Sequence, residues 1–163
     1  REDYSPERDA IAVTGDGEAW RFGLMPFVEV STRNGREYAR PAKGATVVGV
    51  ETIGGLETII AATHKCRAMI CSAEEINYLA GPGKGVILIK TAKDDHVIGF
   101  IASHGDRDLM TVETNRGATK TISTAKYEVT GRGGKGREIQ KTGTFKRVVT
   151  TLDDIGVPAM VER

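Results

Sequence analysis

Two stretches of the sequence decide its fold, IIAATHKCRAM at residues 59–69 and LMTVETNRGATK at residues 109–120. When they are aligned, Thr63 and Thr114 occupy the same position, 51 residues apart. The same spacing separates two copies of the triplet GKG, at residues 83–85 and 134–136. A fixed period of this length is the signature of a repeat architecture.

The first third of the chain follows the same pattern. Its stretch AIAVTGDG at residues 10–17 has a Thr 49 residues before Thr63, and VVGV at 47–50 lies 50 residues before VIGF at 97–100. We align Val148 and Val149 with these last two stretches in the third unit. The predicted organisation is a lead-in at 1–9, three units at 10–58, 59–108 and 109–150, and an acidic exit tail at 151–163.

Each unit contains short runs rich in Val, Ile and Thr, separated by Gly or polar turns. Runs of this length and composition predict β-strands. Asn115 and Gly117 both tolerate positive φ, so the turn around them predicts a β-hairpin. The best helical candidate is a single turn at residues 72–76. Four strands per fifty residues predict an all-β, propeller-like array of four-stranded blades.

Composition is that of an ordered globular domain, with 163 residues, 39% hydrophobic and 28% charged. Disorder is excluded because the chain has enough apolar residues to build a core. No apolar run approaches the ~20 residues that a membrane span needs. The chain begins Arg1-Glu2-Asp3 without Met or a signal peptide, and is interpreted as a piece of a longer protein.

Cysteine and histidine give no sign of a metal or redox site. Cys66 and Cys71 lie five residues apart in one predicted strand, which points their side chains to opposite faces. They are interpreted as reduced, unpaired thiols of a cytoplasmic protein. His64, His96 and His104 are scattered along the sequence. No metal site and no cofactor are expected.

The sequence GRGGKG at residues 131–136 matches the pattern of a nucleotide-binding glycine loop. A strand and a turn follow it instead of a helix, which argues against that function. Lys84 and Lys135 each precede Gly instead of Ser or Thr, which excludes a P-loop. Two interpretations remain open. The glycines allow a tight crossover between blades, or they bring the backbone and its cations close to phosphates.

Charge is distributed unevenly along the chain, although the net charge is only +1. Residues 115–150 contain nine basic side chains and two acidic ones, whereas 1–62, 63–114 and 151–163 each carry a net negative charge. A basic excess confined to one segment predicts that contact with nucleic-acid phosphates is concentrated there.

These motifs together resemble the C-terminal domain of the bacterial DNA gyrase A subunit, and that of the related topoisomerase IV protein. The resemblance covers residues 10–150 and implies a β-pinwheel, a disc of four-stranded blades whose basic rim bends and wraps DNA. The family's glycine box reads QRRGG(K/R)G. It is matched here at Arg132, Gly133, Gly134, Lys135 and Gly136, while Thr130 and Gly131 replace its Gln and first Arg.

The resemblance implies a DNA-binding, DNA-bending or wrapping domain of a type IIA topoisomerase A subunit, which positions a duplex for strand passage and supercoiling control. Implied partners are double-stranded DNA without sequence specificity, the ATPase B subunit, together with the rest of the A subunit, in the bacterial cytoplasm at the nucleoid. The predicted DNA contacts are Arg132, Lys135, Arg137 and Lys141, followed by Arg116, Lys120, Lys146, Arg147, Lys84 and Lys90.

The domain itself is expected to be a non-catalytic part of an ATP-dependent isomerase. No tyrosine has a neighbouring Arg or an acidic metal cluster suited to strand cleavage; the tyrosines are Tyr4, Tyr38, Tyr78 and Tyr127. The alternative function is a protein-interaction propeller without DNA binding, whose acidic first two units dock a partner. A small-molecule enzyme is disfavoured, since Asp94-Asp95 and Asp153-Asp154 are interpreted as turn or tail acids.

Overall fold

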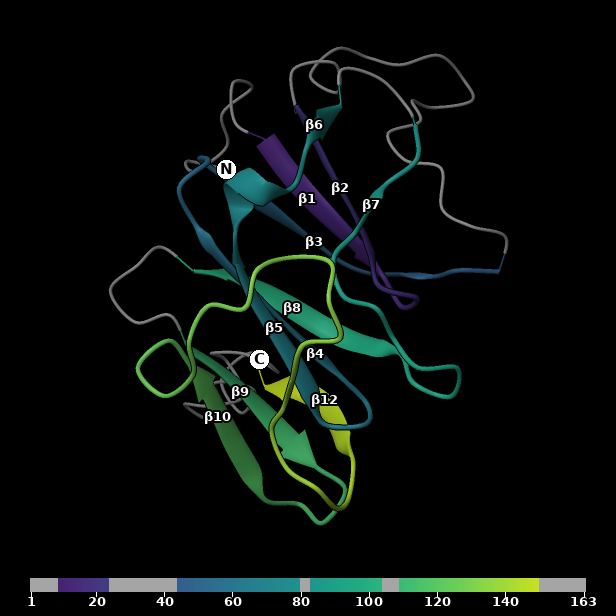
Figure 1. The fold of residues 1–163 in the computed structure, drawn as a ribbon, viewed down its shortest axis with the longest axis vertical. Helices are drawn as coiled ribbons and strands as arrows, with labels where there is room; N and C mark the ends of the chain where they lie inside the picture. The colour runs from purple at the N-terminus through teal and green to yellow at the C-terminus, as the bar shows by residue number, and fades with distance from the viewer. Residues whose placement is uncertain (1–8, 24–43, 80–82, 104–108, 150–163) are drawn as a thin grey trace, which may run out of the picture.

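The computed structural model describes residues 9–23, 44–79, 83–103 and 109–149. The predicted lead-in (all but its last residue), the exit tail, His104, Tyr4 and Tyr38 lie outside these ranges. The all-β prediction is confirmed, since the described residues form strands and one 3₁₀ turn. The strands of the described residues form three sheets, which follow one another along the long axis of the molecule (Figure 1).

The first sheet has the strand order β3-β1-β2-β6, and β7 also pairs with β2. Its strands are β1 (Asp9–Thr14), β2 (Glu18–Gly23), β3 (Val47–Ile53), β6 (Tyr78–Leu79) and β7 (Val86–Ile87). The second sheet has the order β11-β5-β4-β8. Its strands are β4 (Thr58–Thr63), β5 (Arg67–Ser72), β8 (Val97–Ser103) and β11 (Arg137–Glu138).

The third sheet has the order β10-β9-β12. Its strands are β9 (Leu109–Thr114), β10 (Thr119–Ser123) and β12 (Phe145–Val149). Sheets and sequence units do not coincide, because β6 and β7 lie in the first sheet and β11 lies in the second. A strand from each later unit therefore completes the sheet before it. Among the described residues, no strand plays this part on β10.

Most of the core of the described residues lies in the spaces between adjacent sheets, and a smaller cluster of Ala10, Ala12, Trp20 and Phe22 lies on the other face of the first sheet. On β4, Ile59 and Ala61 face the cluster shared with the first sheet, whereas Ile60 and Ala62 face the cluster shared with the third. The middle sheet is therefore buried on both faces, which explains the unbroken apolar run of β4.

Two glycines set how closely adjacent sheets approach. A Cβ added at Gly49 of β3 would lie 3.2 Å from the Phe100 ring of β8, and one added at Gly99 would lie 2.8 Å from Val148 of β12. A larger residue at Gly99 would require the Val148 side chain or its strand to shift, since real Cβ atoms essentially never approach that closely. The spacing of the array thus depends on these glycines.

Each long hairpin closes with a four-residue turn that begins at a buried Thr. We name them the first turn (14–17), the second turn (63–66) and the third turn (114–117). In each, the fourth residue has positive φ: +92° at Gly17, +71° at Cys66 and +87° at Gly117. The predicted hairpin around Asn115 and Gly117 is confirmed.

The assignment of Cys66 to a strand was wrong, because this residue belongs to the second turn and β5 begins at Arg67. Cys66 and Cys71 are both buried and free, and they lie in different core clusters. Burial raises the pKa of the Cys71 thiol to about 12, with Glu75 adding to the rise and Arg132 opposing it. This thiol is therefore protonated at neutral pH.

Two further local predictions have clear outcomes. The single helical turn is confirmed at Ala73–Glu75, with Ser72 and Glu75 forming a capping box. The alignment of Val148 and Val149 with residues 47–50 was displaced. Phe145 pairs with the Thr of the third turn, as Val47 and Val97 pair with those of the first and second. Between this Thr and its partner, the third unit is thus three residues shorter than the second.

Candidate nucleic-acid interface

The glycine loop (residues 130–136) lies against the second sheet, alongside β5 (Figure 1). The backbone N–H groups of Thr130 and Gly131 both donate to the Ile70 carbonyl, at 2.9 and 3.0 Å. The N–H of Gly133 donates to the Leu88 carbonyl at 2.8 Å. These three donors are satisfied within the protein, so their geometry does not support the interpretation in which the loop backbone faces a phosphate.

Arg132 has a structural role that its sequence context did not reveal. Its backbone N–H donates to a carboxylate oxygen of Glu75 at 3.0 Å. Its side-chain Nε donates to the Glu75 carbonyl at 2.9 Å, and a terminal nitrogen donates to the Ile87 carbonyl at 2.8 Å. Since Ile87 belongs to β7 of the first sheet, Arg132 links three segments of the array.

At two positions of the GKG triplets, a neighbouring backbone carbonyl lies so close that only glycine fits. A Cβ at Gly85 would lie 2.7 Å from the Ala19 carbonyl oxygen, and one at Gly136 would lie 2.6 Å from that of Ala68. Each triplet therefore brings a two-residue strand against the preceding sheet. The crossover interpretation of the glycines accounts for these two positions.

Three of the predicted DNA contacts point cations to solvent near the glycine loop. Lys135, Arg137 and Lys141 are exposed, and within the described residues none of them forms an ion pair. The main chain beside Lys135 is fixed, because Arg67 Nε donates to its carbonyl at 2.8 Å. Arg67 itself is thus used to hold the loop.

The remaining cations differ in their surroundings. Lys84, Lys90 and Lys146 are exposed. Burial and the charge of Asp16 raise the pKa of Glu18, and the positive charge of Lys84 opposes this rise. Arg147 forms an ion pair with Glu113 on the neighbouring strand, with 2.8 Å between Nε and Oε1. Its charge is therefore partly neutralised within the third sheet.

Arg116 and Lys120 line an open groove of about 380 Å³ at the third turn. The other side of the groove is formed by Gln140, Thr142 and Gly143, and the Gln140 amide donates to the Thr142 carbonyl at 2.7 Å. Among the described residues, the Arg116 side chain has no hydrogen bond or ion pair. The groove thus combines two cations with neutral polar groups.

The second turn carries a cation that the protein neutralises. Lys65 forms an ion pair with Asp94 through its ammonium group, and its backbone N–H donates to the Asp95 carboxylate at 2.8 Å. The hydrogen bond from Lys65 lowers the pKa of the Asp94 carboxyl, and the same bond raises the pKa of the Lys65 ammonium. Asp94 and Asp95 were interpreted from sequence as turn acids, and this partner was not identified.

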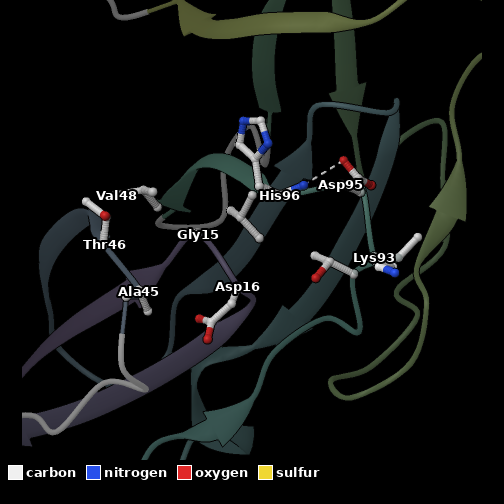
Figure 2. Close-up of a pocket in the computed structure, with 12 residues that line it drawn as sticks. Gly15, Asp16, Ala45, Thr46, Val48, Lys93, Asp95 and His96 are labelled. Carbon is white, nitrogen blue, oxygen red and sulfur yellow. Dashed lines mark hydrogen bonds between the residues drawn. The ribbon is translucent and has the colours of Figure 1, made fainter.

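The first turn carries an acid in place of the cation. Asp16 borders an open groove of about 510 Å³ that also includes Ala45, Thr46 and Lys93 (Figure 2). On its other side, the Asp95 carboxylate accepts the backbone N–H of His96 at 2.8 Å, drawn as the dashed line in Figure 2. The three turns therefore present Asp16, a neutralised Lys65 and an unpaired Arg116 in order along the array.

Two of the scattered histidines come together in the structure. The rings of His64 and His96 stack with centroids 5.0 Å apart, and His64 Nδ1 lies 3.2 Å from the Phe145 carbonyl. The described residues contain no group of three or more potential metal ligands. None of the helical structure in the described residues is long and apolar enough to cross a membrane.

The chain was compared with known proteins. No protein-family model matches it. It is 27% identical over 165 residues to the DNA gyrase A subunit of Helicobacter pylori. That match includes 98% of the chain and 20% of the relative, so the chain spans about one fifth of that protein's length.

Solved structures share the fold. The C-terminal domain of DNA topoisomerase IV matches 91% of the chain and 48% of its own length, with a TM-score of 0.79 and 17% identity. The DNA gyrase A C-terminal domain matches 93% of the chain and 51% of its own length, with a TM-score of 0.71 and 17% identity.

A third structure, the E. coli ParC C-terminal domain, matches 89% of the chain and 62% of its own length, with a TM-score of 0.68 and 13% identity. The chain is therefore similar in sequence to the A protein of DNA gyrase and has the fold of the C-terminal domains of gyrase A and topoisomerase IV.

Proposed function

We propose that this chain is a DNA-binding and DNA-bending domain of a type IIA topoisomerase A subunit. Its role would be to hold a duplex segment for strand passage by the ATPase B subunit together with the rest of the A subunit, in the bacterial cytoplasm. The observation that carries the proposal is the group of exposed, unpaired cations in the third unit, namely Arg116, Lys135, Arg137 and Lys141.

The placement of the cations favours contact with the DNA backbone over contact with base edges. The cations lie in turns and short strands, and no described helix or long ribbon projects from the sheets to enter a groove. Backbone contacts fix the position of a duplex without reading its sequence. The expected preference is therefore for DNA that bends easily.

The test is the salt dependence of binding to a fluorescent ~40 bp duplex. If about five phosphates are neutralised, log Kd should change with log salt with a slope of roughly 4.5, so that affinity falls ~500-fold between 50 and 200 mM salt. Absence of binding at ~50 mM salt would overturn the proposal and favour the protein-interaction alternative.

A matched pair of variants locates the contact. Lys135→Gln is expected to weaken binding by roughly fivefold to tenfold and to lower the slope by ~0.9, as the loss of one phosphate contact requires. Lys93 is also exposed but lies in the second unit, so Lys93→Gln should change the affinity less than twofold. Equal effects of the two variants would contradict the location.

Bending is measured separately, with donor and acceptor dyes at the two ends of the duplex. Energy transfer should rise on binding and should rise more for a duplex with flexible TA and CA steps. Binding without a change in energy transfer would leave DNA binding in place and remove bending from the proposal.

A further inference from the structure

The second and third turns share one backbone arrangement, including the segment that packs beside each turn. In the second turn, the N–H of His64 donates to the His96 carbonyl at 2.8 Å, and Thr63 pairs with Val97. In the third turn, the N–H of Asn115 donates to the Thr144 carbonyl at 2.9 Å. There Thr114 pairs with Phe145.

This arrangement makes particular residues equivalent. Lys65 and Arg116 are each the third residue of their turn. Asp94 and Asp95 directly precede His96, and Thr142 and Gly143 directly precede its equivalent, Thr144. The position of the Asp94-Asp95 pair in the second turn is therefore taken by Thr142 and Gly143 in the third.

The second turn shows which ligand this backbone accommodates. One carboxylate binds the side-chain cation of Lys65, and the next accepts its backbone N–H and that of His96. Anionic oxygens are thus held by a cation, by one N–H of the turn and by one N–H of the segment beside it, a combination that binds carboxylates and phosphates alike.

The third turn keeps the cation and lacks the carboxylates. Arg116 and Lys120 line its groove of about 380 Å³, whose remaining wall is neutral. The backbone N–H of Arg116 makes a longer contact of 3.3 Å, to the Thr114 hydroxyl within the turn. The N–H of Thr144, which is equivalent to that of His96, donates to the Asn115 side-chain oxygen at 3.1 Å, so a neutral amide oxygen takes the place of the Asp95 carboxylate. The Asp94 carboxylate has no such counterpart, so the groove has cations without an internal anion.

We propose that the groove of the third turn binds one phosphate of a nucleic-acid backbone, in the place that the Asp94 carboxylate fills at the second turn. Arg116 is its main ligand, and Lys120 is the second. The inference rests on the proposed DNA binding and locates one contact within it. It also assigns Asp94 and Asp95 as internal anions that block the equivalent contact at the second turn.

The first experiment fills the groove with a carboxylate. Thr142→Asp places an acid at the position equivalent to Asp94, and we expect it to weaken binding of the ~40 bp duplex by roughly tenfold and to lower the salt slope by ~0.9. Thr124→Asp is the matched control, because it adds the same charge to an exposed position at the far end of β10. Its effect should stay below about threefold.

The second experiment tests whether the added acid acts through Arg116. Arg116→Gln alone should reduce affinity and slope by amounts similar to Thr142→Asp. Adding Thr142→Asp to Arg116→Gln should then cost no more than the Thr124→Asp control, because coupled residues are not additive.

The third experiment removes the internal anion beside the second turn. Asp94→Asn leaves the Lys65 ammonium without its partner, so affinity should rise by severalfold and the slope by up to ~0.9. All variants change exposed turn residues, and thermal unfolding verifies that each remains folded.

Two outcomes overturn the inference while DNA binding stands. One is equal loss of affinity from Thr142→Asp and Thr124→Asp, and the other is an unchanged slope in Arg116→Gln. If the unmodified 163-residue chain fails to bind the duplex at ~50 mM salt, the proposed function is overturned together with this site.

Discussion

The first and third sheets contain the same hairpin and stand at opposite ends of the array (Figure 1). In the first sheet, β6 and β7 cover β2, and the Gly17 carbonyl accepts the N–H of Leu88 at 2.8 Å. In the third sheet, no described strand covers β10, and the space beside Gly117 is open. The first turn presents Asp16 where the third presents Arg116.

The first and third sheets therefore use the same repeated hairpin in two different ways. The hairpin backbone is common to all three sheets, so it specifies the fold and not the function. What distinguishes the sheets is the segment packed beside each turn and the side chain at its third position. The first sheet is mainly packed scaffold, whereas the third leaves its turn and its cations open to a ligand.

The largest expected effect comes from substituting the last glycine of the first turn. Gly17 has φ of +92°, and a Cβ there would lie 2.1 Å from the Ile89 carbonyl oxygen. Gly17→Ala should therefore lower the free energy of unfolding by about 3–4 kcal/mol. Gly117→Ala keeps the positive φ but meets no neighbour within 4 Å, so it should cost only about 1 kcal/mol.

Chemical denaturation of the two variants measures this difference directly. Similar losses of unfolding free energy would mean that the first turn is no more tightly packed than the third. This would contradict the difference between the first and third sheets.

A second pair of variants separates structure from binding within the glycine loop. Arg132→Ala removes hydrogen bonds to the Glu75 and Ile87 carbonyls, and we expect a loss of about 2 kcal/mol in unfolding free energy. Lys135→Ala should change stability by less than about 0.5 kcal/mol and act on DNA affinity instead.

Thermal unfolding and DNA titration of both variants give the two readouts. If Arg132→Ala left stability unchanged and reduced only the affinity, Arg132 would be a DNA ligand and not a link between sheets.

The smallest expected effect is a pH dependence at the second turn. The hydrogen bond from Lys65 lowers the pKa of Asp94, so the pair stabilises the fold above the ordinary pKa of an aspartate. That contribution is lost as pH falls through the lowered pKa of the folded state. Over the same range Lys65 is released, and DNA affinity should rise modestly in the native chain but not in Asp94→Asn.

Carboxyl NMR titration of Asp94 gives the pKa, and duplex binding at several pH values gives the affinity. An Asp94 pKa at its ordinary value would show that Lys65 is not held by this carboxylate.

The sequence was sufficient for the hairpins and for the all-β class. Thr63, Thr114 and the GKG triplets recur at fixed spacing, and Asn115-Arg116-Gly117 is local turn chemistry, so neither needs tertiary information. The crossing of β7 and β11 to preceding sheets was not predictable from these patterns. Strands of two residues carry almost no periodic signal, and their pairing depends on packing between distant segments.

The charge pattern was only partly informative about the site. Sequence spacing located the basic third unit, but it could not distinguish Arg132, which is bonded to carbonyls of two other segments, from Lys135, which is exposed. The pairing of Lys65 with Asp94 could not be predicted from the sequence either. It depends on the pairing of β4 with β8, which brings Asp94 beside the second turn. The absence of an equivalent acid in the third unit follows from strand register, because that unit is three residues shorter after its glycine loop.

The most direct test of DNA binding by the third unit is an NMR titration of the ¹⁵N-labelled chain with a ~20 bp duplex at low salt. We predict that amide shifts concentrate at the third turn and around Lys135 and Lys141, while the first turn around Asp16 stays unchanged. Shifts centred on the first sheet, or none at any position, would contradict this prediction.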